Sequence, residues 1–402
     1  MGFSQAVSGM NAASNNLDVI GNNIANSETT GFKSGSVSFA DVFASSQVGL
    51  GVKVAAVTQN FSDGTVNSNG NALNVAISNN GFFRLVDDSG AVHYSRDGNF
   101  SKNASNELVN NSGLHVSGYA ATGTPPTIQQ GTQPVNLTIP TAGLAAQATT
   151  TATMVAKLTS SASILTDANF NTADSSTYSF SQPMTSYDSQ GNPHNISTYF
   201  VKTADNTWQV HAVDSSSTAA AQNLGTLQFD TSGQLTATSA TTFNINMASI
   251  NGSNASSFAL NFAGTQQQYA TASSVSSQTA NGYKAGDLTK YAINNDGTIT
   301  GTYSNGQTQL LGQVVLANFA NPQGLKSDGN NTWSATAESG QAIVGTAGNG
   351  NFGTLTSSAL EGSNVDLSKE LVNMIVAQRD YQSNAQTIKA QNAIMQTLVS
   401  LT

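Results

Sequence analysis

Apolar residues recur at helical spacing near the N-terminus of the chain. Several of them lie seven residues apart, which is the repeat of a coiled-coil seam. The residues that carry this pattern are Phe3, Val7, Met10, Leu17, Ile20 and Ile24. Asparagines crowd the other faces, and both Asn and the interspersed glycines are poor helix formers. The pattern therefore predicts an N-terminal helix that is marginal without a partner.

The C-terminal segment has the stronger helical pattern. It contains neither Gly nor Pro after Ser363, and Asp366 is placed to cap its first turn. Two columns with a seven-residue spacing run along it, and their larger apolar members are Leu371, Met374, Tyr381, Ile388, Met395 and Val399. A helix over 366–401 would be about 50 Å long, and so narrow a seam requires a partner. The candidates are the N-terminal helix and further copies of the chain; the simpler alternative is an amphipathic helix packed on a domain.

Between about residues 61 and 360, short alternating runs are separated by turn signals. Asp or Asn shortly before Gly predicts hairpin turns at 87–90, 187–191, 230–233 and 294–297. The apolar run 310–317 predicts a buried strand. Strands do not alternate with helices, which argues against a doubly wound fold. The predicted fold class is mainly β with α-helical termini: long N- and C-terminal helices form a coiled-coil-like inner domain, beside two nested β-rich domains.

Shifts in composition predict the domain boundaries. The chain becomes rich in Thr and Ala at 123–143 and changes again near 278–284. We expect four parts: a terminal helical polymerisation domain (1–28 and 364–402), a linker region (29–70 and 359–363), a β-rich domain (71–144 and 285–358) and an inserted outer β domain (145–284).

Composition narrows the function classes. Only 9% of the 402 residues are charged, and 22 acidic against 13 basic residues give a net charge of −9. So few basic side chains cannot neutralise a row of phosphates, so neither nucleic acid nor an anionic membrane is an expected partner. The absence of cysteine excludes disulfides and thiolate chemistry. No stretch reaches the about 18 apolar residues of a membrane span, and the first residues do not resemble a cleavable secretory signal.

Motifs that suggest chemistry lack the context that the chemistry needs. Residues 348–353 read G-x-G-x-x-G, but no helix-forming run follows, as a dinucleotide site requires. Residues 294–297 resemble part of a calcium loop without its downstream Glu. The four histidines have no second ligand at metal-binding spacing, and no G-x-S-x-G marks a nucleophile. We predict that the chain is not an enzyme and has no catalytic, cofactor or metal site.

Both ends of the chain carry motifs of a known family. The N-terminal motifs are SGMNAA (8–13), NLDVIGNNIAN (16–26) and TGFK (30–33), and the C-terminal ones are LEGSNVDL (360–367) and LVNMIVAQRDY (371–381). Together they resemble the terminal signatures of the flagellar rod and hook proteins, the axial proteins of the bacterial flagellum. GLGVKV (49–54) and NGFF (80–83) fit the same family. The length of the chain and its inserted β domain resemble the hook members from enteric bacteria rather than the shorter rod members.

The resemblance implies a structural hook subunit that assembles with copies of itself into a flexible helical tube. Such a tube joins rod to filament and transmits motor torque as a universal joint. The implied location is the extracellular hook, reached by export without a cleavable signal. The implied partners are the chain itself, the distal rod protein, the hook cap scaffold, the hook-length control protein, the hook–filament junction proteins and the flagellar type III export apparatus. Another axial component, such as a distal rod or hook-associated protein, is the first alternative; a secreted β-rich adhesin is a remote one.

Overall fold

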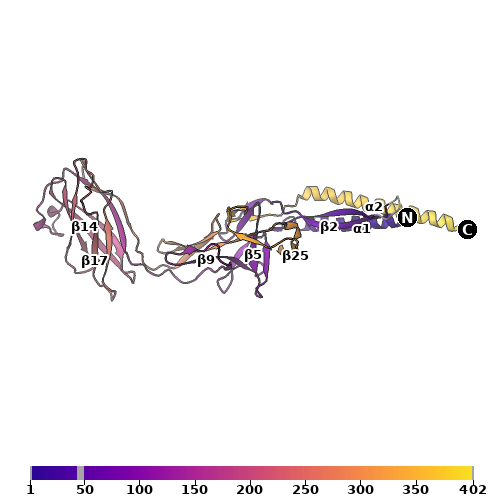
Figure 1. Cartoon of the computed structure of the whole chain (residues 1–402), viewed down its shortest axis with the longest axis horizontal. Helices are drawn as coiled ribbons and strands as arrows, with labels where there is room; N and C mark the ends of the chain where they lie inside the picture. Colours follow the sequence, from indigo (N-terminus) through magenta and orange to yellow (C-terminus); the bar gives the residue numbers. More distant parts are fainter. Residues whose placement is uncertain (1, 43–48, 401–402) are drawn as a thin grey trace. The chain divides into compact units, whose positions relative to one another are not determined.

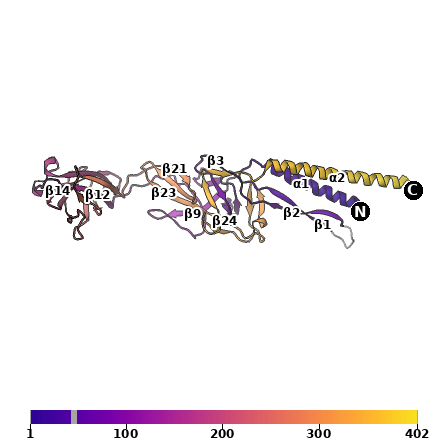
Figure 2. The same cartoon turned by 90° about the horizontal axis from the view of Figure 1, so that it is seen from above.

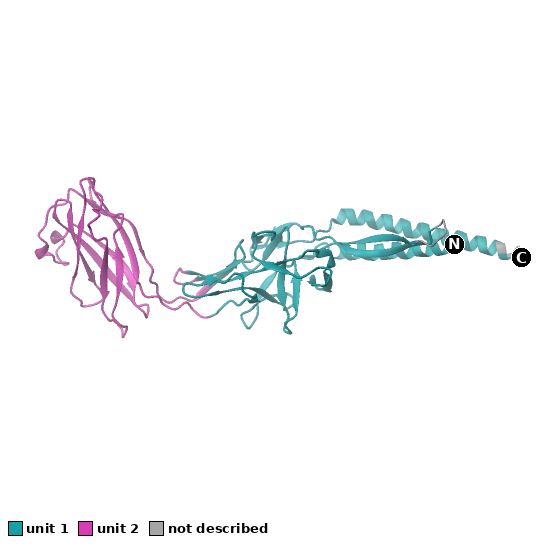
Figure 3. Cartoon of the chain, viewed as in Figure 1, with its two compact units in different colours: residues 1–141, 290–302, 308–402 teal, residues 142–289, 303–307 magenta. Residues whose placement is uncertain are grey.

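A computed structural model describes residues 2–42 and 49–400 of the chain. It divides into two compact units, shown in different colours in Figure 3. Unit 1 comprises residues 1–141, 290–302 and 308–402, and unit 2 comprises residues 142–289 and 303–307. The chain is mainly β with one helix at each end, which confirms the coarse fold prediction. Neither helix is both long and apolar enough to cross a membrane.

The two terminal helices belong to unit 1 and lie side by side (Figures 1 and 2). The N-terminal helix is α1 (Gly2–Ala25) and the C-terminal helix is α2 (Leu367–Ser400). Asp366 caps α2 as expected, because its Oδ1 accepts the backbone N–H of Lys369 at 3.1 Å. The 34 residues of α2 make a rod of about 51 Å.

A β-hairpin follows α1 and packs on it (Figure 2). Its strands are β1 (Gly35–Val42) and β2 (Gly51–Gln59), paired antiparallel with a bulge between Ser38 and Phe39. The residues that would join the two strands, 43–48, lie outside the described part of the chain. The linker prediction for residues 29–70 gave no fold for this segment, and the structure assigns it a hairpin.

The rest of unit 1 is a β-rich region around one large sheet. Its central order is β21-β22-β23-β9-β5-β6-β26-β25, and two strand pairs, β4–β28 and β3–β29, stand beside it. The strands are β3 (Val66–Ser68), β4 (Val75–Ser78), β5 (Phe82–Val86), β6 (Val92–Ser95), β7 (Phe100–Lys102), β8 (Leu108–Asn110), β9 (His115–Thr122), β10 (Thr127–Ile128), β11 (Val135–Asn136), β21 (Leu288–Ile293), β22 (Thr298–Tyr303), β23 (Thr308–Val314), β24 (Leu316–Asn318), β25 (Lys326–Gly329), β26 (Thr332–Ser334), β27 (Ile343–Gly345), β28 (Thr354–Ser357) and β29 (Ala359–Glu361).

Unit 2 is a sandwich of two sheets. One sheet has the order β17-β18-β12-β19 with β20 also paired to β12, and the other has the order β13-β14-β15-β16. Buried side chains of both sheets form one core, which includes Phe200, Trp208 and Phe262. The strands are β12 (Thr151–Thr159), β13 (Phe180–Tyr187), β14 (Pro193–Ala204), β15 (Thr207–Asp214), β16 (Gln222–Gln228), β17 (Thr242–Met247), β18 (Ser256–Asn261), β19 (Gln266–Gln268) and β20 (Ser274–Ala280).

The turn signals of the sequence mark real turns. In all four predicted turns the Gly N–H donates to the carbonyl of the Asp or Asn three residues earlier, at 2.9–3.1 Å. Gly90, Gly191, Gly233 and Gly297 all adopt a positive φ, which Gly tolerates without steric cost. The expected strand 310–317 is broken at Val315 into β23 and β24, which pair with different neighbours. The G-x-G-x-x-G segment 348–353 is a turn that leads into strand β28 rather than a helix.

Candidate self-assembly site

The two terminal helices meet in a regular antiparallel register. Asn384 lies against the backbone of Gly9, where an added Cβ would come within 2.7 Å of Asn384 Oδ1. Asn16 and Ala377 both line the two cavities at this contact. Glu370 lies seven residues before Ala377, so it has the same heptad position on α2 and is nearer the start of the helix. Gly9 and Asn16 are seven residues apart on α1, as are Ala377 and Asn384 on α2, so the two helices run antiparallel; a coiled-coil seam between them stays a prediction.

Small residues allow α1 to approach its neighbours closely. Ala6, Ala13 and Ile20 are buried and lie seven residues apart along α1. On α2, Ala377 is buried. The predicted residues Phe3, Met10 and Leu17 lie beside this buried column, whereas the predicted residue Ile20 belongs to it.

The twelve residues predicted for the seams have different surroundings within one copy. Ile20 is buried, whereas Phe3 is exposed. The half-buried members are Val7, Met10, Leu17, Ile24, Met374 and Ile388. The exposed members on α2 are Leu371, Tyr381, Met395 and Val399. Their role in contacts between copies remains a prediction.

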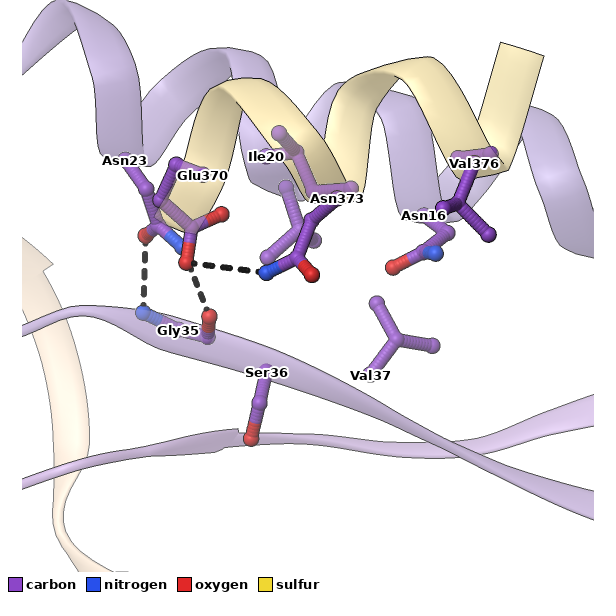
Figure 4. A pocket seen from close by; sticks show the side chains of 11 residues that line it. Asn16, Ile20, Asn23, Gly35, Ser36, Val37, Glu370, Asn373 and Val376 are labelled. Carbon is purple, nitrogen blue, oxygen red and sulfur yellow. Dashed lines mark hydrogen bonds between the residues drawn. The ribbon is translucent and has the colours of Figure 1, made fainter. Parts of the chain in front are cut away.

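Asn23 is one of the asparagines predicted on the faces of α1 away from the apolar stripe. Its side chain is buried and forms two hydrogen bonds with Gly35 of β1 (Figure 4). Asn23 Nδ2 donates to Gly35 O at 2.8 Å, and Gly35 N donates to Asn23 Oδ1 at 2.9 Å. The side-chain amide of Asn23 thus pairs with Gly35 as the backbone of a neighbouring strand would. Its N–H and its oxygen both have hydrogen-bond partners, as buried polar groups need. Sequence periodicity gives no signal for such a pairing.

A cavity of about 230 Å³ lies between α1, β1 and α2 (Figure 4). Its polar lining includes Asn16, Asn23, Ser36, Glu370 and Asn373. Asn373 Nδ2 donates to Glu370 Oε1 at 3.5 Å, a long hydrogen bond. The lining has the polar partners that ordered water needs, but no pairing of a nucleophile with a base.

Four buried or half-buried charged side chains join the helical pair to the β-rich region; we call them the junction cluster. Its members are Lys33, Asp63, Arg96 and Glu361. Lys33 Nζ lies 2.7 Å from Glu361 Oε1, and both side chains are fully buried. Arg96 contacts Glu361 Oε2 at 3.2 Å and Asp63 Oδ1 at 2.6 Å. Burial and the Arg96 guanidinium lower the pKa of Lys33, while Glu361 opposes this shift.

The junction cluster holds four segments of the chain together. Lys33 follows α1, Asp63 follows β2, Arg96 follows β6, and Glu361 precedes α2. Asn364 strengthens the same crossing: its Oδ1 accepts the backbone N–H of Ser34 at 2.8 Å, and its Nδ2 donates to Asn60 O at 2.7 Å. Two cations and two anions at this point balance, which a buried cluster requires. The sequence prediction did not identify the cluster, since its members are far apart along the chain.

An aromatic cluster secures the base of the hairpin. Phe61, just after β2, packs edge-to-face on Phe82 and Trp333 with ring centroids 5.4 Å and 5.6 Å apart. The indole Nε1 of Trp333 donates to the Gln59 side chain at the end of β2. Such aromatic contacts add about 0.5–1.5 kcal/mol each beyond burial. The hairpin is therefore fixed to the β-rich region by packing as well as by charge.

Asp97 is a half-buried carboxyl beside the junction. Its Oδ1 accepts the backbone N–H of Asn99 at 3.0 Å, and no salt bridge to Asp97 occurs among the described residues. Burial raises the pKa of Asp97 from 3.8 to about 6. Gly31 lies directly against it, with φ +69° and a Cβ position 2.6 Å from Asp97 N, so only glycine fits there.

We expect Asp97→Asn to stabilise unit 1 at pH 8 by about 1–3 kcal/mol. The raised pKa means that the folded state holds the proton more tightly, so the ionised carboxylate costs stability above pH 6 and this cost fades toward pH 4. Asn keeps the acceptor for Asn99 without the charge. Urea unfolding of parent and variant at pH 8 and pH 4, followed by Trp333 fluorescence in a Trp208→Phe background, measures the difference. An equal effect at both pH values would contradict the assignment.

The histidines pair with carboxylates rather than with one another. In unit 2, buried His194 Nδ1 lies 2.6 Å from Asp214 Oδ2 and its Nε2 lies 3.7 Å from Asp188 Oδ2. Burial acts to raise the pKa of Asp188, but hydrogen bonds from Ser253 and Asn192 outweigh it and hold the pKa at about 2. Among the residues that the structure describes, no group of three His, Asp or Glu side chains is placed to hold a metal ion.

Known protein families match both ends of the chain and both of its β-rich regions. The family "Flagella basal body rod protein" matches residues 4–33, and "Flagellar basal body rod FlgEFG protein C-terminal" matches 356–401. "Flagellar hook protein FlgE/F/G D1 domain" matches 76–155, and "Flagellar basal body protein FlaE D2 domain" matches 157–283. The helical pair and the β-rich regions thus define a protein of the flagellar rod and hook class.

Full-length relatives narrow the class. The flagellar hook protein FlgE of Escherichia coli K12 is 58% identical over 402 residues, with 100% of both chains covered. FlgE of Salmonella typhimurium LT2 is 57% identical with the same coverage, and FlgE of Treponema pallidum is 31% identical with 98% of each covered. The chain therefore belongs to the flagellar hook protein family, whose members are structural proteins and not enzymes.

A solved structure supports the fold. The crystal structure of the Helicobacter pylori flagellar hook protein FlgE2 aligns with a TM-score of 0.52 at 12% identity. The alignment covers 72% of this chain and 98% of that one. At this identity the likeness concerns the fold alone.

Proposed function

We propose that this chain is the self-assembling subunit of a flagellar hook and that residues 1–28 with 364–402 are its polymerisation domain. The observation that carries the proposal is that α2 exposes more large apolar side chains than any other described element, although α1 packs along it. Burial of such a surface contributes about 25 cal/mol per Å². Patches of this kind mark interaction sites, and a helix face is best covered by another helix.

The proposed division of labour is by layer. The terminal helices form a coiled-coil-like inner layer, with the seam residues shared between the α1–α2 contact and contacts between copies. Exposed Asn and Gln side chains of the same helices line a polar channel through which unfolded chains pass without sticking. The β-rich domain (71–144 and 285–358) and the inserted domain (145–284) lie outside, and the linker region (29–70 and 359–363) connects the layers. Outer surfaces that are rich in Ser, Thr and Asn allow neighbouring copies to slide when the tube bends.

The family supports an assembled location outside the cell, in the hook. We propose that the tube joins rod to filament as a universal joint and carries motor torque between them. The proposed partners are further copies of this chain, the distal rod protein, the cap scaffold, the length-control protein, the junction proteins at the far end and the type III export apparatus. No cofactor enters this function.

We expect the purified chain to form tubes under salting-out conditions, as seen by negative-stain electron microscopy, and Met374→Asp and Ile388→Asp each to abolish them. Both side chains are half-buried on α2, in the seven-residue column that also contains Tyr381 and Met395. An unpaired carboxylate there is costly to bury, so the helical pair and its contacts with other copies are lost together.

Gln386→Asp is the matched control, because Gln386 is exposed on the same helix and the substitution adds the same charge. Tubes from this variant and the parent, but not from the other two, support the proposal; curved tubes favour a hook over a rigid rod. Normal tubes from Met374→Asp and Ile388→Asp would refute the assignment of the seam.

A further inference from the structure

The first turns of α2 carry an exposed apolar surface that we call the stripe. It consists of Leu367, Leu371, Val372 and Ile375, whose side chains are 45–60% exposed. The helical period places these four on one face of α2, whereas Glu370 and Ala377 line the side toward α1. The stripe spans nine residues, about 13 Å along the helix axis.

The last turns of α2 extend beyond the start of α1, and we call residues 392–400 the overhang. In the register set by Gly9 with Asn384 and Asn16 with Ala377, Gly2 lies opposite Gln391. Figure 2 shows α2 continuing past the beginning of α1. These nine residues are also about 13 Å long.

The overhang presents an uncharged face to solvent. Asn392, Met395, Gln396 and Val399 line a shallow hollow on one side of the helix, and Met395 is 60% exposed. Met395 continues the seven-residue column of Met374 and Ile388, both of which are half-buried. No charged residue occurs from Ala390 to Ser400. A neutral apolar element is therefore the natural cover for this face.

We propose that the overhang of one copy docks on the stripe of a second copy. The two surfaces have the same length. The overhang contains no charged side chain that would oppose their contact. Head-to-tail docking brings the partial negative charge at the end of one α2 near the partial positive charge at the start of the next. The proposal rests on assembly through the terminal helices and names the two surfaces that would meet.

The geometry has a consequence for the assembly. The stripe and the overhang lie at opposite ends of α2, so the contact joins two different surfaces. In a pair of copies, the stripe of one copy and the overhang of the other stay free. Contacts of this heterologous kind propagate into open helical polymers rather than closing into a dimer. One contact repeated at every subunit thus accounts for growth along a line.

Disulfide trapping tests the contact directly, because the chain contains no cysteine. We expect a Val372→Cys/Met395→Cys double variant, oxidised under assembly conditions, to give a ladder of covalent multimers with a 372–395 cross-link in peptide mass spectrometry. Each single variant is expected to give little cross-linking. A Val372→Cys/Gln386→Cys double variant, with Gln386 in the middle of α2, is the matched control. A ladder of equal yield from the control, or efficient cross-linking of Val372→Cys alone, would overturn the proposal.

A complementation experiment separates this inference from the proposed function. Val372→Asp damages the stripe and keeps the overhang; a chain that ends at Gln391 keeps the stripe and lacks the overhang. Each alone is expected to sediment as a monomer, and an equal mixture as a species of twice the mass, since one intact contact remains. Circular dichroism verifies that both variants fold. Tubes from the shortened chain would overturn the inference alone, whereas a parent chain that never assembles would overturn both.

Discussion

Replacing Glu361 by Gln is expected to lower the free energy of unfolding of unit 1 by about 3–5 kcal/mol, because breaking a buried ion pair leaves its partner charges uncompensated. Here the partners are Lys33 and Arg96, both essentially inaccessible to solvent. The same carboxylate also accepts the backbone N–H of Gly64 at 2.9 Å. Urea unfolding in a Trp208→Phe background measures the loss, since Trp333 is then the only tryptophan and lies in unit 1.

Two variants make this measurement specific. Glu338→Gln changes an exposed glutamate of unit 1 and is expected to alter stability by less than about 0.5 kcal/mol. A Lys33→Met/Glu361→Gln double variant removes one of the stranded cations and is expected to recover part of the loss. A Glu361→Gln effect as small as that of Glu338→Gln would show that the junction cluster does not hold unit 1 together.

Phe200→Ala is expected to destabilise unit 2 by about 3–5 kcal/mol, the usual cost of truncating a buried phenylalanine. Phe200 is fully buried between the two sheets of the sandwich. Its ring packs edge-to-face on Phe262 with centroids 5.7 Å apart and stacks on Phe180 at the same distance. Truncation removes both contacts and opens a cavity where the sheets meet. Trp208 in a Trp333→Phe background reports unfolding of unit 2.

Tyr269→Ala serves as the matched control in the same unit. Tyr269 is 86% exposed, so loss of its ring is expected to change stability by less than about 0.5 kcal/mol. If Phe200→Ala and Tyr269→Ala had similar effects, the sandwich core would not be the main source of stability in unit 2.

The sequence predicts local elements well where one strong signal sets them. The terminal helices lie within a residue or two of their expected bounds, because unbroken helical periodicity and the Asp366 cap define them. The four turns are correct because Asp, Asn and Gly dictate backbone geometry directly. The β1–β2 hairpin has no such signal: Ala55, Ala56 and Val57 are all exposed, so apolar and polar positions do not alternate along β2.

The contacts of the candidate site are harder to predict because they depend on fit and on distant residues. A seam chosen by the size of side chains favours Phe3 and Met10, whereas the structure buries Ala6 and Ala13, since helix and hairpin approach closely there. The burial of Asn23 depends on the edge of a strand that the sequence did not reveal. Lys33 and Glu361 are 328 residues apart, and no spacing rule links them.

That separation in sequence determines when the ion pair that joins the terminal helices to the β-rich region can form. Lys33 gains its ion-pair partner only when Glu361 packs against it. Nearly the whole chain must therefore be present before the loop between these two residues can close. Contacts of such long range form late, because the entropy of closing a large loop must be overcome first. A chain cut short before residue 361 keeps a buried lysine without its carboxylate and α1 without its helical partner. The ion pairs of the junction cluster need residues from both ends of the chain. Only a chain that contains both ends can therefore form the cluster and pack α1 against α2.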